Sequence, residues 1–278
     1  CIYSLVALAL FLSFRILNIA DMTTNGAFTL GCAVSATIAL AGHPYLAFPA
    51  AMLAGAAAGF VTALLQTRFR IPSILAGIIT DTGLYTVNLA VMGFSSNVNL
   101  LKKATLFSEL KPMLGTYYRL VPSALIAIIT VVLLVLFLKT RLGLSIRATG
   151  DNPDMVRASS INTNFTITVG LCVANACTAL SGALLAQYQK AADINLGGGM
   201  VIIGLASLII GEALMPKGKL WMKAAGAVVG SIVYRFIIAI ALRLDLPSEC
   251  LKLISAVIVA LAIGLPALTN AKGGKVKC

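Results

Sequence analysis

Polar side chains gather at two glycine-bearing breaks between apolar segments, and these breaks are the first candidates for chemistry. The first break contains a carboxyl, two hydroxyls and an amide ahead of a glycine: Asp21, Thr23, Thr24, Asn25 and Gly26. The second break contains Asn195, Gly197 and Gly198. Backbone groups freed by a broken membrane helix must face protein or a water-filled cavity. We therefore predict that both breaks line a route for a polar solute.

Other polar residues are scattered inside apolar runs, where each is costly and needs a partner or water. They are Asp81, Thr82, Asn88, Asn175, Ser207 and Glu212. A structural hydrogen-bonding role is favoured for each one taken singly. Glu212 has three open roles: a gate, an ion-pair partner of Lys217 or Lys219, or a contact to another protein. Arg235, deep in an apolar run, needs an acidic partner or an aqueous cavity.

The residues of catalytic and metal sites are scarce. The single histidine, His43, lies in a Gly-His-Pro turn, which favours a structural role at the membrane interface over metal ligation or proton relay. The six cysteines form no CxxC pair. No GxxxxGK[ST] phosphate loop is present, so ATP would have to act through a partner. We expect no enzyme activity, cofactor or metal in this chain.

The elements that position these residues must be membrane helices. Of 278 residues, 59% are hydrophobic and 11% charged, whereas globular domains carry about 25% charged residues. Lipid cannot hydrogen-bond an exposed backbone, and the long unbroken apolar stretches favour helices over a barrel. The net charge of +12 comes from Lys and Arg placed mostly between the apolar runs. No basic stripe with interleaved aromatics indicates binding of nucleic acid.

Nine apolar segments predict an all-α, polytopic transmembrane helical bundle, with about 8–10 membrane segments, forming a single transmembrane domain over residues 1–278. The segments run roughly over 1–17, 27–42, 46–66, 73–94, 119–138, 164–188, 200–215, 221–241 and 250–268. The segments 27–42 and 200–215 are short enough to be broken, tilted or re-entrant. The distribution of positive charge predicts an outside N-terminus and a cytoplasmic C-terminus.

The order of glycine and proline punctuation repeats along the chain. The first half contains "TTNGAF", "GHPYLAF", "AGAAAG" and "RFRIPS", and the second "LGGGM", "LMPKGKLW", "AGAVVG" and "RLDLPS". With the predicted sidedness the halves have opposite orientation, which is the inverted-repeat plan of many transporters. Two GxxxG spacings, Gly55 with Gly59 and Gly226 with Gly230, predict close helix packing.

The polar, basic segment 139–163 is predicted to lie in the cytoplasm. Asn152 can cap a helix, Pro153 suits a first turn and Asp154 suits the positive helix end, which predicts a short helix from Pro153 to about Ser160. An isolated helix this short is marginal in water. Docking onto another protein is one interpretation, and a solvated linker is the other.

Four runs of the sequence resemble a known protein family. The run "RATGDNPDMVRASSIN", followed by "LCVANACTALSGALLAQYQ", resembles the permease family of bacterial ATP-binding cassette importers that includes the branched-chain amino acid and ribose permeases. The runs "FRILNIADMTTNGAFTLGCAVSA" and "IGLASLIIGEAL" resemble two further blocks of that family. The family usually carries glycine where this sequence has Ser160.

The resemblance implies a multi-pass permease of a bacterial cell membrane. Its expected partners are a cytoplasmic ATPase, an extracytoplasmic substrate-binding protein and a second permease copy, in a homodimer or a pseudo-symmetric heterodimer. The ATPase would be contacted within 139–163, by Arg147, Gly150, Asn152, Asp154, Arg157 and Asn162. The expected cargo is an amino acid, with sugars or nucleosides as the alternative. A secondary transporter using Asp21 and Asp81 as ion-coupling carboxylates is the alternative from another class.

Overall fold

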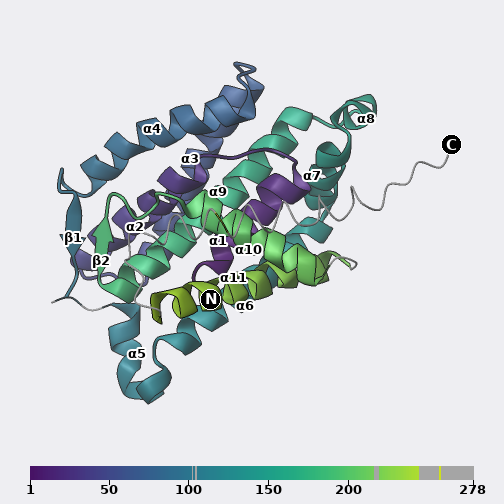
Figure 1. Ribbon diagram of the computed structural model, residues 1–278. Helices are drawn as coiled ribbons and strands as arrows, with labels where there is room; N and C mark the ends of the chain where they lie inside the picture. Colours follow the sequence, from purple (N-terminus) through teal and green to yellow (C-terminus); the bar gives the residue numbers. More distant parts are fainter. Residues whose placement is uncertain (102, 104, 216–218, 244–256, 258–278) are drawn as a thin grey trace.

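The computed structural model describes residues 1–101, 103, 105–215, 219–243 and 257, and this part of the chain is mainly helical (Figure 1). Its helices are α1 (Ser4–Leu10), α2 (Thr24–Leu40), α3 (Ala47–Thr67), α4 (Ser73–Val91), α5 (Leu106–Leu114), α6 (Leu120–Lys139), α7 (Arg141–Asp151), α8 (Pro153–Ala158), α9 (Thr163–Gln189), α10 (Met200–Leu214) and α11 (Leu220–Arg243). The π-helix η1 (Phe11–Ile16) continues α1, and the short 3-10 helix η2 (Gly115–Tyr117) follows α5.

Five of the described helices, α3, α4, α6, α9 and α11, are long and apolar enough to cross a membrane. The helix formed by α1 and η1, together with α2 and α10, is apolar but shorter. The predicted all-α polytopic bundle is therefore confirmed. The shortness expected of the segments at 27–42 and 200–215 is seen in α2, with 17 residues, and α10, with 15. The ninth predicted segment, 250–268, lies outside the described residues.

Helix α9 lies at the centre of the bundle, where it packs on α2 and α3 and also on α1. Of its span, 78% is buried, compared with at most 39% in the other four long helices. Small residues allow this central position, because the helix backbones can approach closely where little side chain intervenes. A Cβ at Gly55 of α3 would overlap the Asn175 carbonyl of α9, and one at Gly59 would overlap the Leu171 carbonyl.

The second GxxxG spacing lies where α11 crosses α10. A Cβ at Gly230 would overlap the Ser207 carbonyl of α10, whereas one at Gly226 would lie 3.1 Å from the Gly211 carbonyl oxygen. The crossing is therefore tightest at Gly230. Gly226 retains slightly more space, so the two glycines are not equivalent.

A helix from each half of the chain packs on a pair of helices from the other half. Helix α9, from the second half, packs on the α2 and α3 pair, while α1, from the first half, packs on the α10 and α11 pair. A short antiparallel ladder joins β1 (Asn97–Asn99), after α4, to β2 (Ala191–Asp193), after α9. The ladder places the ends of α4 and α9 together, which agrees with the predicted sidedness of both segments.

Candidate translocation site and coupling segment

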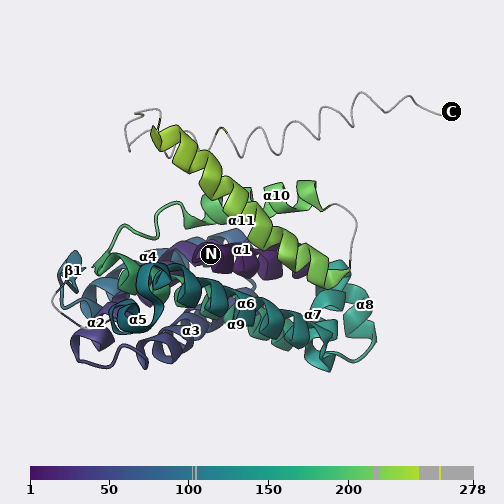
Figure 2. The same cartoon turned by 90° about the horizontal axis from the view of Figure 1, so that it is seen from below.

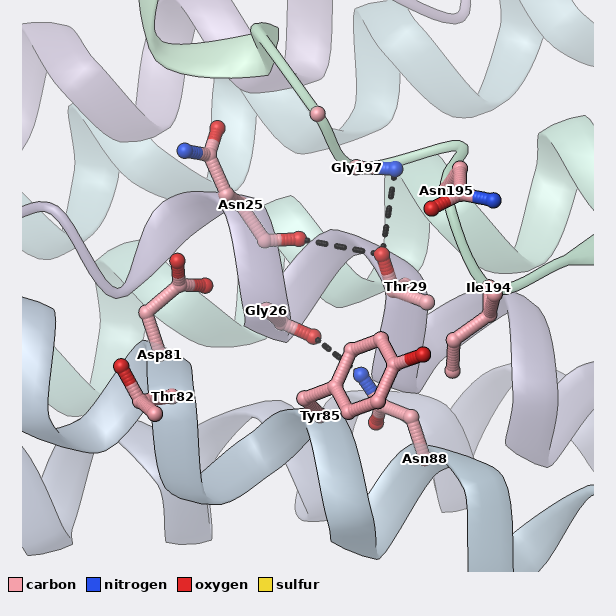
Figure 3. Close-up of a pocket in the computed structure, with 11 residues that line it drawn as sticks. Asn25, Gly26, Thr29, Asp81, Thr82, Tyr85, Asn88, Ile194, Asn195 and Gly197 are labelled. Atoms are coloured by element: carbon pink, nitrogen blue, oxygen red, sulfur yellow. Dashed lines mark hydrogen bonds between the residues drawn. The ribbon is translucent and has the colours of Figure 1, made fainter. Parts of the chain in front are cut away.

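The two polar breaks open onto one cavity of about 390 Å³ (Figure 3). Three elements line it: the start of α2, one face of α4 and the loop that leads into α10. Among the residues predicted for the pathway, five line the cavity: Asn25, Gly26, Asn195, Gly197 and Gly198. The fold therefore brings together two glycine-bearing breaks that lie far apart in the sequence.

Direct hydrogen bonds hold the two breaks against each other. Thr29 donates to the Asn25 carbonyl at 3.2 Å and accepts from the Gly197 amide at 3.1 Å (Figure 3). The Asn25 side-chain oxygen accepts from the Val201 amide, in the first turn of α10, at 3.1 Å. A Cβ at Gly197 would overlap the Asn25 carbonyl, so this approach requires glycine. These bonds hold the starts of α2 and α10 in contact with each other.

Asp21, Thr23 and Thr24 are buried and do not line the cavity. The Asp21 carboxylate accepts from the Thr23 amide at 2.9 Å and from the Asn175 side-chain amide of α9 at 2.7 Å. The Thr23 and Thr62 hydroxyls are 2.7 Å apart, and the Thr24 hydroxyl donates to the Asp21 carbonyl at 3.3 Å. These three residues fix the start of α2 against α3 and α9, and the neighbouring Asn25 and Gly26 reach the cavity.

Helix α4 supplies a polar wall of the cavity. This wall was not predicted, because the polar residues of the helix were considered one at a time. Asp81, Thr82, Tyr85 and Asn88 all line the cavity, at positions i, i+1, i+4 and i+7 of one helix face. That helical periodicity was the signal available in the sequence. Tyr85, like Thr29, was not among the predicted residues. Its side chain reaches the cavity from α4 (Figure 3).

Two side chains of this wall contact the start of α2. The Asp81 carboxylate lies against Gly26, because a Cβ at Gly26 would come within 2.7 Å of its Oδ1 atom. At this position the positive end of the α2 helix dipole favours an anion. The Asn88 side-chain amide donates to the Gly26 carbonyl at 3.2 Å. The Asn88 side-chain oxygen is buried and has no hydrogen-bond partner among the described residues. An acceptor is therefore available beside the cavity.

The segment 139–163 contains two helices where one was predicted. The predicted cap of α8 is present, because the Asn152 side-chain oxygen accepts from the Asp154 and Met155 amides at 3.1 Å each. Helix α8 ends at Ala158, and Ser160 has φ of 60°. This left-handed conformation costs a residue other than glycine about 1–2 kcal/mol.

Helix α7 was not predicted, and it ties the segment to the membrane bundle. A Cβ at Gly150 would overlap the Ile16 carbonyl of η1, so α7 lies directly on that helix. The Thr149 and Thr166 hydroxyls, 2.8 Å apart, join α7 to α9. Arg147 points elsewhere, into a cavity it shares with Arg15.

The remaining residues predicted to contact an ATPase lie on α8 and at the start of α9. Asp154 and Arg157 form an exposed ion pair at 3.2 Å, and Arg157 also donates to the Thr163 hydroxyl at 3.2 Å. The Asn162 side chain caps α9 by accepting from the Asn164 and Phe165 amides at 3.0 and 3.3 Å. Helix α9 therefore begins in this segment, and further along the helix its Asn175 side chain contacts Asp21 at the first break.

Glu212 and Arg235, whose partners the sequence left open, both have contacts in the structure. Glu212 pairs with Arg15 of η1 at 2.7 Å. Of the lysines considered as its partner, Lys217 lies outside the described residues. The Arg235 guanidinium lies over the Tyr3 ring, 3.3 Å from its centroid, and lines a cavity of about 420 Å³. An aqueous cavity was one of the two environments expected for it.

Comparisons with known proteins agree with this architecture. Residues 1–264 match the family described as the permease component of branched-chain amino acid transport systems. The chain is 36% identical to the tyrosine transport system permease protein of Clostridioides difficile, over 93% of this chain and 85% of that protein. It is 22% identical to the ribose import permease protein RbsC of Haemophilus influenzae, over 87% and 75% of the two chains. It is 27% identical to the autoinducer 2 import system permease protein LsrC of Yersinia enterocolitica, over 83% and 61%. No solved structure matches.

Proposed function

Because this chain belongs to the family of permease components of branched-chain amino acid transport systems, we propose that it carries an aromatic amino acid into a bacterial cell. The family predicted from the sequence motifs is confirmed, and the chain is the multi-pass permease of an ATP-binding cassette importer. The tyrosine permease relative supports an aromatic cargo. The ribose and autoinducer 2 permeases, at lower identity, support the sugar alternative.

The observation that carries the amino acid proposal is the charge arrangement of the shared cavity. Helices α2 and α10 both begin there, and helix N-termini favour negative groups such as a carboxylate. Asp81 and the unpartnered Asn88 oxygen are acceptors, which favour an ammonium group. One small solute with both groups is an amino acid. A sugar would use only hydroxyl contacts here.

A second permease copy would complete the pathway. Thr82, Tyr85 and Thr86 are exposed on α4, within a helix that is long enough to cross the membrane. Polar side chains on a membrane helix face protein or water in preference to lipid. The α4 faces of two copies would therefore enclose the route between them, in a homodimer. A substrate-binding protein would deliver cargo from outside.

The energy for transport would come from a separate cytoplasmic ATPase. The exposed α8 is available for docking, and its bond to Thr163 at the start of α9 provides a mechanical connection. Displacement of α8 would move α9, whose Asn175 holds Asp21 at the first break. In this mechanism the segment 139–163 couples the ATPase to the transport pathway. The C-terminus would lie in the cytoplasm, on the same side as that segment.

Uptake by cells tests the proposed cargo. Deletion of the gene in its own bacterium should abolish ATP-dependent uptake of radiolabelled tyrosine, and the restored gene should recover it. Uptake of labelled ribose, measured in the same cells, is the matched control. Lost ribose uptake with normal tyrosine uptake would instead establish the sugar alternative. Tagged permease purified from these membranes should bring an ATPase with it.

Replacing Arg157 with alanine should partly uncouple ATP hydrolysis from transport. The change removes bonds to Asp154 and Thr163, and one such hydrogen bond contributes about 1 kcal/mol, or about fivefold in an equilibrium. We expect the ratio of solute imported to ATP hydrolysed, measured in proteoliposomes of the complex, to fall by a similar factor. Arg68→Gln, an exposed charge outside the segment, should leave the ratio unchanged. A normal ratio in both Arg157→Ala and Asp154→Ala would reduce the segment to a tether.

A further inference from the structure

A second polar cavity, of about 500 Å³, is lined by residues of η1, α7 and the start of α11. Figure 2 shows α7 and the start of α11 at the opposite end of the bundle from β1. Among the described residues, four cationic side chains and one acidic side chain, that of Asp151, line the cavity. The cations are Arg15, Arg147, Lys219 and Lys223. They come from three separate elements, so the fold itself concentrates the positive charge.

Local electrostatics in this cavity are unfavourable without an anion. Lys219 and Lys223 are spaced i, i+4, and like charges at that spacing repel. The Lys219 carbonyl accepts from the Met222 and Lys223 amides at 2.9 and 3.2 Å, so both lysines flank the first turn of α11. The positive end of a helix dipole adds to their charge. Only Arg15 has a strong described partner, Glu212, which does not line the cavity.

The position of the cavity indicates where the anion comes from. Helix α11 becomes a candidate membrane span at Leu220, which itself lines the cavity together with Ile16. The next residue, Trp221, is exposed, and tryptophan is enriched where helices cross the membrane–water interface. The cavity therefore lies at the depth of lipid headgroups, on the side predicted to be cytoplasmic. Basic pockets between helices at this depth bind anionic headgroups.

We propose that this cavity binds the phosphate of an anionic phospholipid from the cytoplasmic leaflet. Phosphate oxygens would accept from the guanidinium groups and the two ammonium groups, while Ile16 and Leu220 meet the glycerol and upper acyl chain. The lipid would join α7 to η1 and α11. Because α7 belongs to the segment proposed for coupling, the bound lipid would hold that segment on the bundle.

Native mass spectrometry of the purified, delipidated importer complex tests this binding. Phosphatidylglycerol should bind and phosphatidylcholine should not. Lys219→Gln/Lys223→Gln should weaken phosphatidylglycerol binding about 30-fold, because each basic residue near an anionic surface contributes about 1 kcal/mol. Arg68→Gln removes an exposed charge elsewhere and should leave binding unchanged. If the double variant cannot be purified, Lys223→Gln alone should give about a fivefold loss.

Other results would overturn the proposal. Unchanged phosphatidylglycerol binding in the lysine variants would exclude the cavity as the lipid site. Equal stabilisation of the complex by inorganic phosphate alone, at the same concentration, would assign the cavity to a soluble anion. Loss of the copurifying ATPase from the double variant, with lipid binding intact, would make the cavity a protein-docking site.

Discussion

Leucine in place of Gly55 is expected to leave little folded permease in the membrane. A Cβ at this position would overlap the Asn175 carbonyl and the Ala179 side chain of α9. The obstacle includes helix backbone, which cannot rotate away as a side chain can, so the cost should exceed the usual 1–3 kcal/mol or so of overpacking. Fluorescence-detected size exclusion of a tagged protein measures the yield of folded chain directly.

Substitutions at two other glycines provide comparisons for the yield of Gly55→Leu. Gly83→Ala places a methyl where no heavy atom lies within 4 Å, so its yield should be normal. Gly226→Leu, expected from the spacing alone to resemble Gly55→Leu, should be the milder of the two. A Cβ at Gly226 would lie 3.1 Å from the Gly211 carbonyl oxygen, which is a tight contact but not an overlap. Normal yield of Gly55→Leu with an altered substrate preference would show that Gly55 lines the pathway.

Asp81→Asn is expected to lower the initial rate of ATP-driven uptake by about tenfold or more. The change weakens the proposed hydrogen bond between the Asp81 carboxylate and the ammonium group of the solute, and a hydrogen bond to a charged group contributes about 1.5–3 kcal/mol. Asparagine has nearly the same size and shape as aspartate, so the packing of this side chain against Gly26 should be kept. The yield of folded complex should therefore be nearly normal. Uptake by membrane vesicles, normalised to the amount of complex, separates the two effects.

Glu109→Gln is the matched control, because this carboxyl is exposed on α5 and does not line the cavity. If Asp81→Asn lowers yield and uptake together, Asp81 only fixes the start of α2 and does not contact the solute. The same vesicles examine the secondary-transporter alternative. Collapse of the proton and sodium gradients should leave uptake intact while ATP is present, and loss of uptake would implicate Asp81 or Asp21 in ion coupling.

Several features could be predicted from the sequence because they depend on composition or on neighbouring residues. Apolar length established the membrane helices, since about 20 residues span the hydrocarbon. The Asn152 cap could be predicted because the capping side chain and the amides it accepts from are adjacent in the chain. Helix α7 could not, because Gly143 and Gly150 disfavour a helix by propensity alone. Packing on η1 and α9 compensates for that cost.

The division of the first break was decided by the tertiary structure. Asp21 and Asn25 are equally polar and only four residues apart, so the sequence placed both on the route. Helix α9 provides Asn175 as a partner for Asp21, while α10 provides the Val201 amide for Asn25 beside the cavity.

The sequence by itself determined a bundle of membrane helices with glycine-bearing breaks and a capped polar segment. The tertiary structure decided which polar residues meet. Asp81 with Gly26 and Arg15 with Glu212 are contacts between separate elements. The four cations that line the second cavity also come from separate elements. The physical reason is that a residue's type and local spacing set its cost in the membrane, whereas the packing of distant helices supplies the partner that offsets this cost.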